Sequence, residues 1–176
     1  VLNVALRFID RMKKEWTLSE PNLSAWDISE TDFPGGTTPR ELLIRAVRYA
    51  ILAPSSHNPE PSQFRIKVEQ LELYADRTRA LAVVDHADRE LVISCGAALF
   101  TLRVCLQNFG VEPAIELQPD GPNSDLLARV SVGKPRIPTA QDRTLRRAIT
   151  QRRTTRTPFE TRELPDPLQR SLASVV

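Results

Sequence analysis

Cysteine, histidine and glycine are scarce in this sequence, which has two cysteines, two histidines and six glycines in 176 residues. Cys95 and Cys105 fall within one stretch of helical periodicity, and at about 100° per residue their side chains point apart, so they cannot form a disulfide with each other. We therefore expect two buried, reduced thiols in a cytoplasmic protein. We find no metal-ligand cluster, no Gly-rich phosphate loop and no Ser–His–Asp set, so we assign no metal site and no catalytic residue.

Long apolar runs and a strong net charge are also missing. No apolar run reaches the roughly 18 residues that span a bilayer. The N-terminal residues carry scattered charges of both signs without a long apolar region, so we expect no secretory signal and no membrane partner. The net charge of +2 does not suggest a general polyanion-binding protein, and a hydrophobic content of 41% supports one ordinary domain with a core.

The periodicity of the chain predicts a mixture of helices and antiparallel strands, hence an α+β fold. The clearest helix start is Thr38, which is followed by Pro39 at the first helical position and by Glu41 at the capping-box position. The predicted helices cover residues 2–15, 38–52, 89–109, 142–151 and 165–173, and the predicted strands cover residues 63–68, 70–74, 111–117 and 126–132. Residues 89–109 form the longest helix, which is apolar on most of its circumference, and we expect it to be buried on several sides.

A polar loop separates the helix over 38–52 from the first strand. It contains Pro54, Ser55, Ser56 and Asn58, whose side chains offer donors and acceptors for a polar ligand. The alternative is a simple helix-to-strand turn, in which these side chains satisfy backbone groups.

A second segment, over residues 151–159 and here called the arginine segment, is rich in arginine and continues a basic stretch over residues 143–156. Arg152, Arg153 and Arg156 offer fork-shaped guanidinium donors and Thr154 offers a hydroxyl, a set that suits a phosphate dianion. Two alternatives remain, a solvated basic face and a nucleic-acid patch. The absence of interleaved exposed aromatic residues weakens the nucleic-acid interpretation, and we expect no nucleic-acid partner.

Together these two segments resemble the FMN-dependent nitroreductase family. The stretch RAVRYAILAPSSHNPEPSQFRI matches the family's loop pattern, with glutamate at Glu60 and serine at Ser62 where the family has glutamine and tryptophan. The stretch RRTTRTPFETRELPDPLQRSLAS is similar to the family's Arg-Arg-Ser-x-Arg signature. The matching residues are Ala53, Pro54, Ser55, Ser56, Asn58 and Pro61 in the loop, and Arg152, Arg153, Thr154, Arg156 and Phe159 in the arginine segment.

The order of the two motifs resembles the tandem, Acg-like branch of the family, in which two repeats share one chain. The arginine signature precedes the loop in a single-repeat nitroreductase, whereas here it follows the loop by about one domain. This order predicts an N-terminal helix and an arm or lid over 1–37, a first nitroreductase-like repeat over 38–135, and a linker with the truncated start of a second repeat over 136–176.

The resemblance implies a nitroreductase-like fold, with an antiparallel-rich sheet flanked by helices around a long central helix. It also implies FMN bound between the loop of one unit and the arginines of the other, in a homodimer or an internal pseudo-dimer whose second repeat is missing here. The implied activity is hydride transfer from NAD(P)H through the flavin to a nitroaromatic, quinone or similar small-molecule acceptor. A flavin-sequestering protein without turnover is the alternative, favoured by Ser62 and by the Trp- and acid-rich arm over 16–34.

Overall fold

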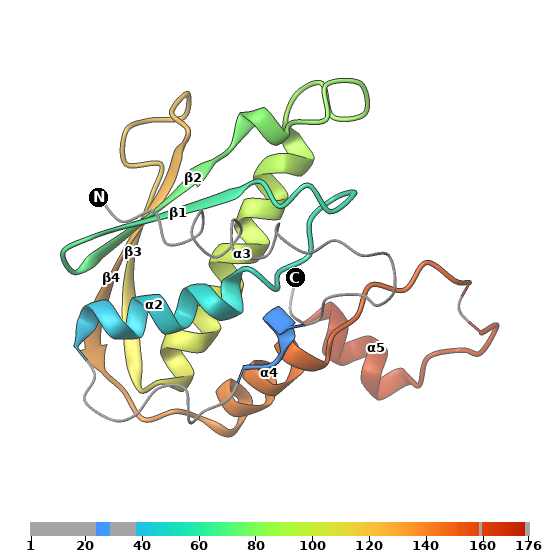
Figure 1. Ribbon diagram of the computed structural model, residues 1–176. Helices are drawn as coiled ribbons and strands as arrows, with labels where there is room; N and C mark the ends of the chain where they lie inside the picture. Colours follow the sequence, from blue (N-terminus) through green and yellow to red (C-terminus); the bar gives the residue numbers. More distant parts are fainter. Residues whose placement is uncertain (1–23, 29–37, 159, 175–176) are drawn as a thin grey trace.

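A computed structural model describes residues 24–28, 38–158 and 160–174 of the chain (Figure 1). The elements are η1 (Ser24–Trp26), α2 (Pro39–Ala50), β1 (Ser62–Lys67), β2 (Gln70–Ala75), η3 (Arg77–Arg79), α3 (Arg89–Asn108), β3 (Val111–Leu117), β4 (Leu126–Pro135), α4 (Ala140–Gln151) and α5 (Asp166–Ala173). The helix predicted over 2–15, most of the arm over 16–37 and the match at position 159 lie outside the described residues. The division into an arm and two repeats stays a prediction.

The capping box predicted for α2 is confirmed. The side-chain oxygen of Thr38 accepts a hydrogen bond from the backbone N–H of Glu41 at 3.3 Å, and the Glu41 carboxylate accepts one from the backbone N–H of Thr38 at 3.0 Å. The helix ends at Ala50, two residues earlier than predicted, because its last turn tightens into i→i+3 hydrogen bonds before Pro54. The buried side chains of the helix are Leu42, Leu43, Ala46, Val47, Tyr49 and Ala50.

The strands form one antiparallel sheet in the order β1-β2-β4-β3. Strands β1 and β2, predicted over 63–68 and 70–74, form an antiparallel hairpin in which Lys67 pairs with Gln70, so Val68 and Glu69 form the turn. One face of the sheet is apolar, built by Phe64, Ile66, Leu71, Leu73, Ala128 and Val130. Helices α2 and α3 pack against this face and against each other, and α4 packs against α3 (Figure 1). The observed fold is therefore α+β, as predicted.

Helix α3 is the long central helix, but it is not buried all round. It packs against α2, α4 and the sheet, as predicted for a helix buried on several sides, and one further face carries the exposed side chains of Val92, Ile93 and Phe100. By length and composition alone α3 could cross a membrane, a test that the core helix of a soluble protein also passes, and half of the residues in its most apolar window are buried. Cys95 and Cys105, on its inner side, are free and buried, and burial raises the pKa of both thiols.

Asp85, which no local sequence pattern marks as a cap, caps α3. The buried Asp85 carboxylate accepts a hydrogen bond from the backbone N–H of Leu91 at 2.9 Å. Asp88, the residue just before the helix, makes no side-chain cap bond. Burial by itself would raise the pKa of Asp85, but the backbone N–H groups of the first helical turn outweigh this effect and hold the pKa below its usual value.

We predict that Asp85→Asn lowers the melting temperature by a few degrees at neutral pH, since the first turn of α3 loses a charged acceptor. A carboxyl whose pKa is lowered by folding stabilises the protein above its unfolded pKa, near 4, and this stability is lost as the pH falls through the folded pKa. Thermal unfolding of both proteins between pH 7 and pH 3 should therefore show a difference that shrinks toward acid. Asp120→Asn, which removes an exposed ion pair with Arg129, is the control with little effect. An equal difference at every pH would contradict the assigned role.

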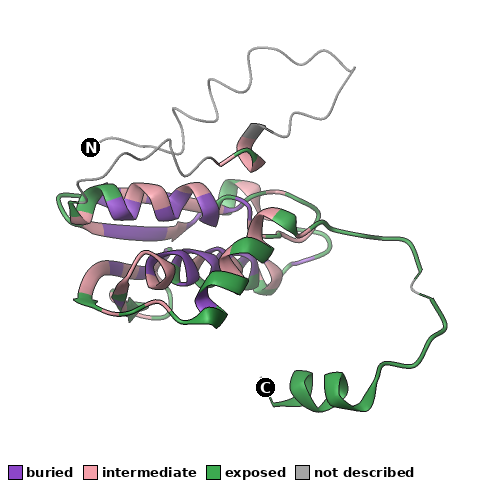
Figure 2. Cartoon of the chain, turned by 90° about the horizontal axis from the view of Figure 1, so that it is seen from below, coloured by how far each residue is buried: buried purple, intermediate pink, exposed green. Residues whose placement is uncertain are grey.

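The C-terminal helices differ in how they pack. Thr139 and Asp142 form a second capping box at the start of α4, which begins two residues before the predicted helix. Figure 2 shows α5 set apart from the packed elements, exposed along its length at the end of the extended segment that follows α4. The arginine segment lies where the chain leaves α4, so its first residues are still close to the body of the protein.

Candidate functional site

The polar loop between α2 and β1 has an unusual backbone. Three of its residues have positive φ although none is glycine: His57 at 57°, Asn58 at 61° and Glu60 at 53°. This left-handed conformation costs an L-residue about 1–2 kcal/mol. Such a cost persists only where the surrounding structure holds the backbone in place, and strained loops of this kind often carry function.

Helix α3 holds the middle of the loop. The backbone N–H of Ser56 donates to the Ser94 hydroxyl oxygen at 3.2 Å, and the Ser56 hydroxyl donates to the carboxylate of Glu90. The Ser94 hydroxyl in turn donates to the Glu90 carbonyl oxygen at 2.7 Å. Ser56, Glu90 and Ser94 are here called the loop anchor. In it, the backbone N–H and the hydroxyl proton of Ser56 are both taken up by hydrogen bonds within the protein.

Two hydrogen bonds hold the second half of the loop, while the tip of the loop is exposed. The guanidinium of Arg79 donates to the carbonyl oxygen of Pro59 at 2.7 Å, and the backbone N–H of Glu60 donates to the Ser55 hydroxyl oxygen at 3.1 Å. Asn58 is exposed, and its carboxamide has no hydrogen-bond partner among the described residues. The side-chain amide of Asn58 and the hydroxyl proton of Ser55 are therefore available to hydrogen-bond an external ligand.

Arg152 lies beside this loop. Its Nη2 donates to the carbonyl oxygen of Leu52 at 3.0 Å, across 100 positions of sequence, and Leu52 is two residues before Pro54. Its Nη1 donates to the Thr154 hydroxyl oxygen at 3.2 Å. The structure thus brings the start of the arginine segment to the start of the polar loop.

The other predicted arginines are placed differently. The guanidinium of Arg153 folds back onto the carbonyl oxygens of Thr150 and Arg152, both at 2.8 Å. Arg156 is exposed and makes no contact with the loop among the described residues. Of the three arginines, only Arg152 is hydrogen-bonded next to the loop.

Three further residues shape this region and belong to neither sequence motif. Glu90 and Ser94 lie four positions apart, hence on one face of α3, but nothing local showed that this face meets the loop. Trp26 is the third, and its ring lies 4.3 Å from the Arg153 guanidinium carbon and 5.6 Å from that of Arg152. Its position in the sequence, more than 120 residues away, gave no signal of this contact.

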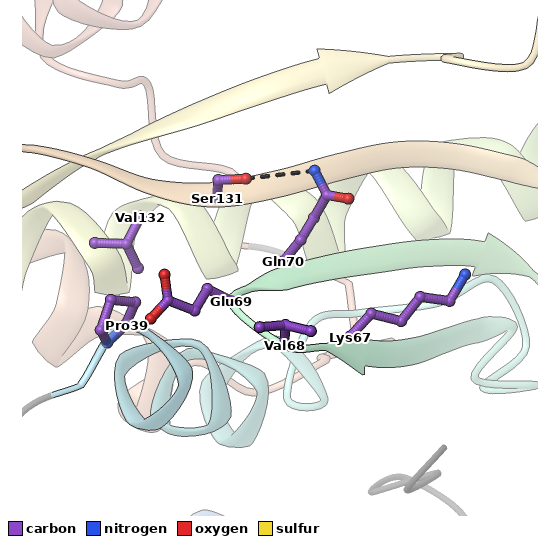
Figure 3. A pocket seen from close by; sticks show the side chains of 7 residues that line it. All are labelled: Pro39, Lys67, Val68, Glu69, Gln70, Ser131 and Val132. Carbon is purple, nitrogen blue, oxygen red and sulfur yellow. Dashed lines mark hydrogen bonds between the residues drawn. The ribbon is translucent and has the colours of Figure 1, made fainter.

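A separate hollow of about 360 Å³ lies at the other end of α2 (Figure 3). Its lining residues are Pro39, Lys67, Val68, Glu69, Gln70, Ser131 and Val132, and Gln70 donates across it to the Ser131 hydroxyl at 3.5 Å. It contains none of the predicted site residues. Among the described residues, no group of three or more His, Cys, Asp or Glu side chains is arranged to hold a metal ion.

Comparisons with known proteins extend these observations. No family model matches the chain. The chain is 36% identical over 135 residues to "Putative NAD(P)H nitroreductase Rv3131" of Mycobacterium tuberculosis, an alignment that covers 77% of this chain and 38% of that protein. It is 35% identical over 127 residues to "Putative NAD(P)H nitroreductase acg" of the same organism, which covers 72% of this chain and 38% of that protein.

A third relative from that organism, "Uncharacterized protein Rv3127", is 34% identical over 123 residues, covering 68% of this chain and 36% of that protein. The chain thus spans less than two fifths of the length of the curated relatives that it matches. The α+β fold around a long central helix agrees with this similarity. The chain belongs to the nitroreductase family.

Proposed function

We propose that this chain forms part of an FMN site in an oxidoreductase that uses NAD(P)H to reduce a nitroaromatic, a quinone or a similar acceptor. The observation that carries the proposal is the hydrogen bond from Arg152 to the Leu52 carbonyl oxygen. It joins the start of the loop to an arginine segment 100 residues away. The names of two relatives, NAD(P)H nitroreductases, support the type of reaction.

The donors in this region fit the chemistry of FMN. Arg152, Thr154 and Arg156 offer N–H and O–H groups to a phosphate dianion, and Arg153 adds positive charge beside them. The amide of Asn58 and the hydroxyl of Ser55 suit ribityl hydroxyls or the polar edge of a pyrimidine ring. When bound, FMN supplies the hydride chemistry, while the protein supplies position and electrostatics.

Ser56 and Pro54 have supporting roles in this proposal. The loop anchor occupies the donor groups of Ser56, so Ser56 holds the loop in shape. Pro54 begins the polar loop after the end of α2, two residues beyond the Leu52 carbonyl that accepts from Arg152. The cytoplasmic location that we propose suits the two free, buried thiols of α3.

Anaerobic spectroscopy tests the function. A yellow protein that is bleached by NADPH and recoloured by a nitroaromatic supports the oxidoreductase. A yellow protein that NADPH cannot reduce supports the alternative, a flavin-sequestering protein. The observation that favours this alternative is Ser62, the first residue of β1, which stands where the resembling family pattern has a tryptophan. A colourless protein that binds RNA with steep salt dependence would refute both.

We further propose that the exposed face of α3 packs against a second nitroreductase-like unit, either a second copy of this chain or a second repeat. Val92, Ile93 and Phe100 on this face are 41%, 60% and 50% exposed. Apolar side chains gathered on one face of a central helix are typical of an interaction surface. In this arrangement the two units share the flavin site.

We predict that the Ile93→Asp, Phe100→Asp double variant is monomeric, whereas the unchanged chain forms dimers. Burying two carboxylates without partners opposes association, and we expect the dimer dissociation constant to rise at least about 100-fold. Light scattering after gel filtration measures the mass. Val83→Asp, on an exposed loop residue, is the control that should leave the mass unchanged. If the unchanged chain is already monomeric at high concentration, it does not self-associate through this face.

A further inference from the structure

Trp26 is attached to the body of the protein through the arginine segment. Its ring stacks near the guanidinium groups of Arg153, at 4.3 Å, and Arg152, at 5.6 Å. Two residues later, Ile28 packs against the hydrophobic core. Residues 24–28 therefore contact the core and the arginine segment at the same time.

Stacking leaves the hydrogen-bonding edge of an arginine available. A guanidinium that lies over an aromatic ring interacts through its face, so its N–H groups, which lie in the plane, stay accessible. Arg152 uses one N–H on Leu52 and another on Thr154. The indole and the Leu52 carbonyl thus fix Arg152 from two directions while further N–H donors remain.

We propose that Trp26 is a positioning residue for the phosphate end of the flavin site, which holds Arg152 and Arg153 in order before FMN binds. A flexible arginine loses rotamer freedom when it binds an anion, and a side chain already held in place loses less. This inference rests on the proposed FMN site. It adds that the phosphate end depends on a tryptophan outside both sequence motifs.

Comparison of FMN with riboflavin tests this inference, because riboflavin lacks the phosphate. We expect Trp26→Ala to weaken FMN binding by roughly 3- to 10-fold and to leave riboflavin binding unchanged. Trp26→Phe, which keeps an aromatic face, should retain most of the FMN affinity. Quenching of flavin fluorescence during titration measures both dissociation constants. Val83→Ala, on an exposed loop residue, is the control and should change neither of them.

The outcomes separate this inference from the function on which it rests. If the unchanged protein binds neither flavin, both the FMN site and the role of Trp26 are refuted. If it binds FMN more tightly than riboflavin and Trp26→Ala preserves the ratio of the two affinities, only the role of Trp26 is refuted. Loss of both affinities to the same extent would indicate a general structural role and would also overturn the inference. Trp26→Phe keeps the test valid if the alanine variant does not fold.

Discussion

The Arg152→Ala, Arg156→Ala double variant is expected to lose bound FMN during purification. Charge-assisted hydrogen bonds to a phosphate are worth more than neutral ones, and removing both guanidinium groups should weaken FMN binding by roughly 10- to 100-fold. Arg152 should contribute most, because it is the arginine held beside the loop by the Leu52 carbonyl. Flavin absorbance per protein after gel filtration, followed by titration with FMN, gives the loss.

The control for this variant is Arg143→Ala, Arg147→Ala, which removes the same charge from the exposed side of α4. It should keep FMN, since long-range charge alone is screened by salt. Equal loss in both double variants would show that general positive charge, and not these donors, holds the cofactor. Full retention in the Arg152→Ala, Arg156→Ala variant would remove the phosphate assignment.

Ser94→Ala is expected to release the polar loop from α3. The substitution leaves the backbone N–H of Ser56 without its acceptor, which should lower the free energy of unfolding by about 1–3 kcal/mol. Without this bond, the positive-φ residues of the loop can relax toward ordinary conformations. We therefore expect faster amide hydrogen exchange over residues 54–60 and weaker FMN binding.

Two variants control for the loss of a hydroxyl and of a charge. Ser131→Ala removes a serine that makes only a long, 3.5 Å contact with Gln70, and should change stability and flavin binding little. Glu90→Gln keeps an acceptor for the Ser56 hydroxyl and should have a smaller effect than Ser94→Ala. If Ser94→Ala destabilises the protein while loop exchange and FMN affinity stay unchanged, the loop anchor has no role in the site.

The secondary structure was largely predictable because its signals are local. The capping box at Thr38, the alternation of the β1–β2 hairpin and the long apolar helix depend on residues close together in sequence. The start of α3 was harder to interpret, because the capping carboxylate comes from Asp85, several residues before the helix. Its exposed face was also not predictable, since apolar composition does not distinguish a buried face from an interaction surface.

The candidate site was predictable only in part. Both motifs could be found from their residues, and their resemblance to one family placed them in one site. The contacts that join them are tertiary: Arg152 to Leu52, Ser94 to Ser56 and Trp26 to the arginines. Each depends on how helices pack on the sheet, which the pattern of a single sequence does not specify.

Equilibration of the purified protein with FMN, followed by gel filtration, shows whether this chain contributes an FMN site. We expect flavin absorbance to elute with the protein, and the Arg152→Ala, Arg156→Ala variant to elute without it. A protein that stays colourless, with all of the FMN eluting as free cofactor at every protein concentration, would show that the chain forms no FMN site.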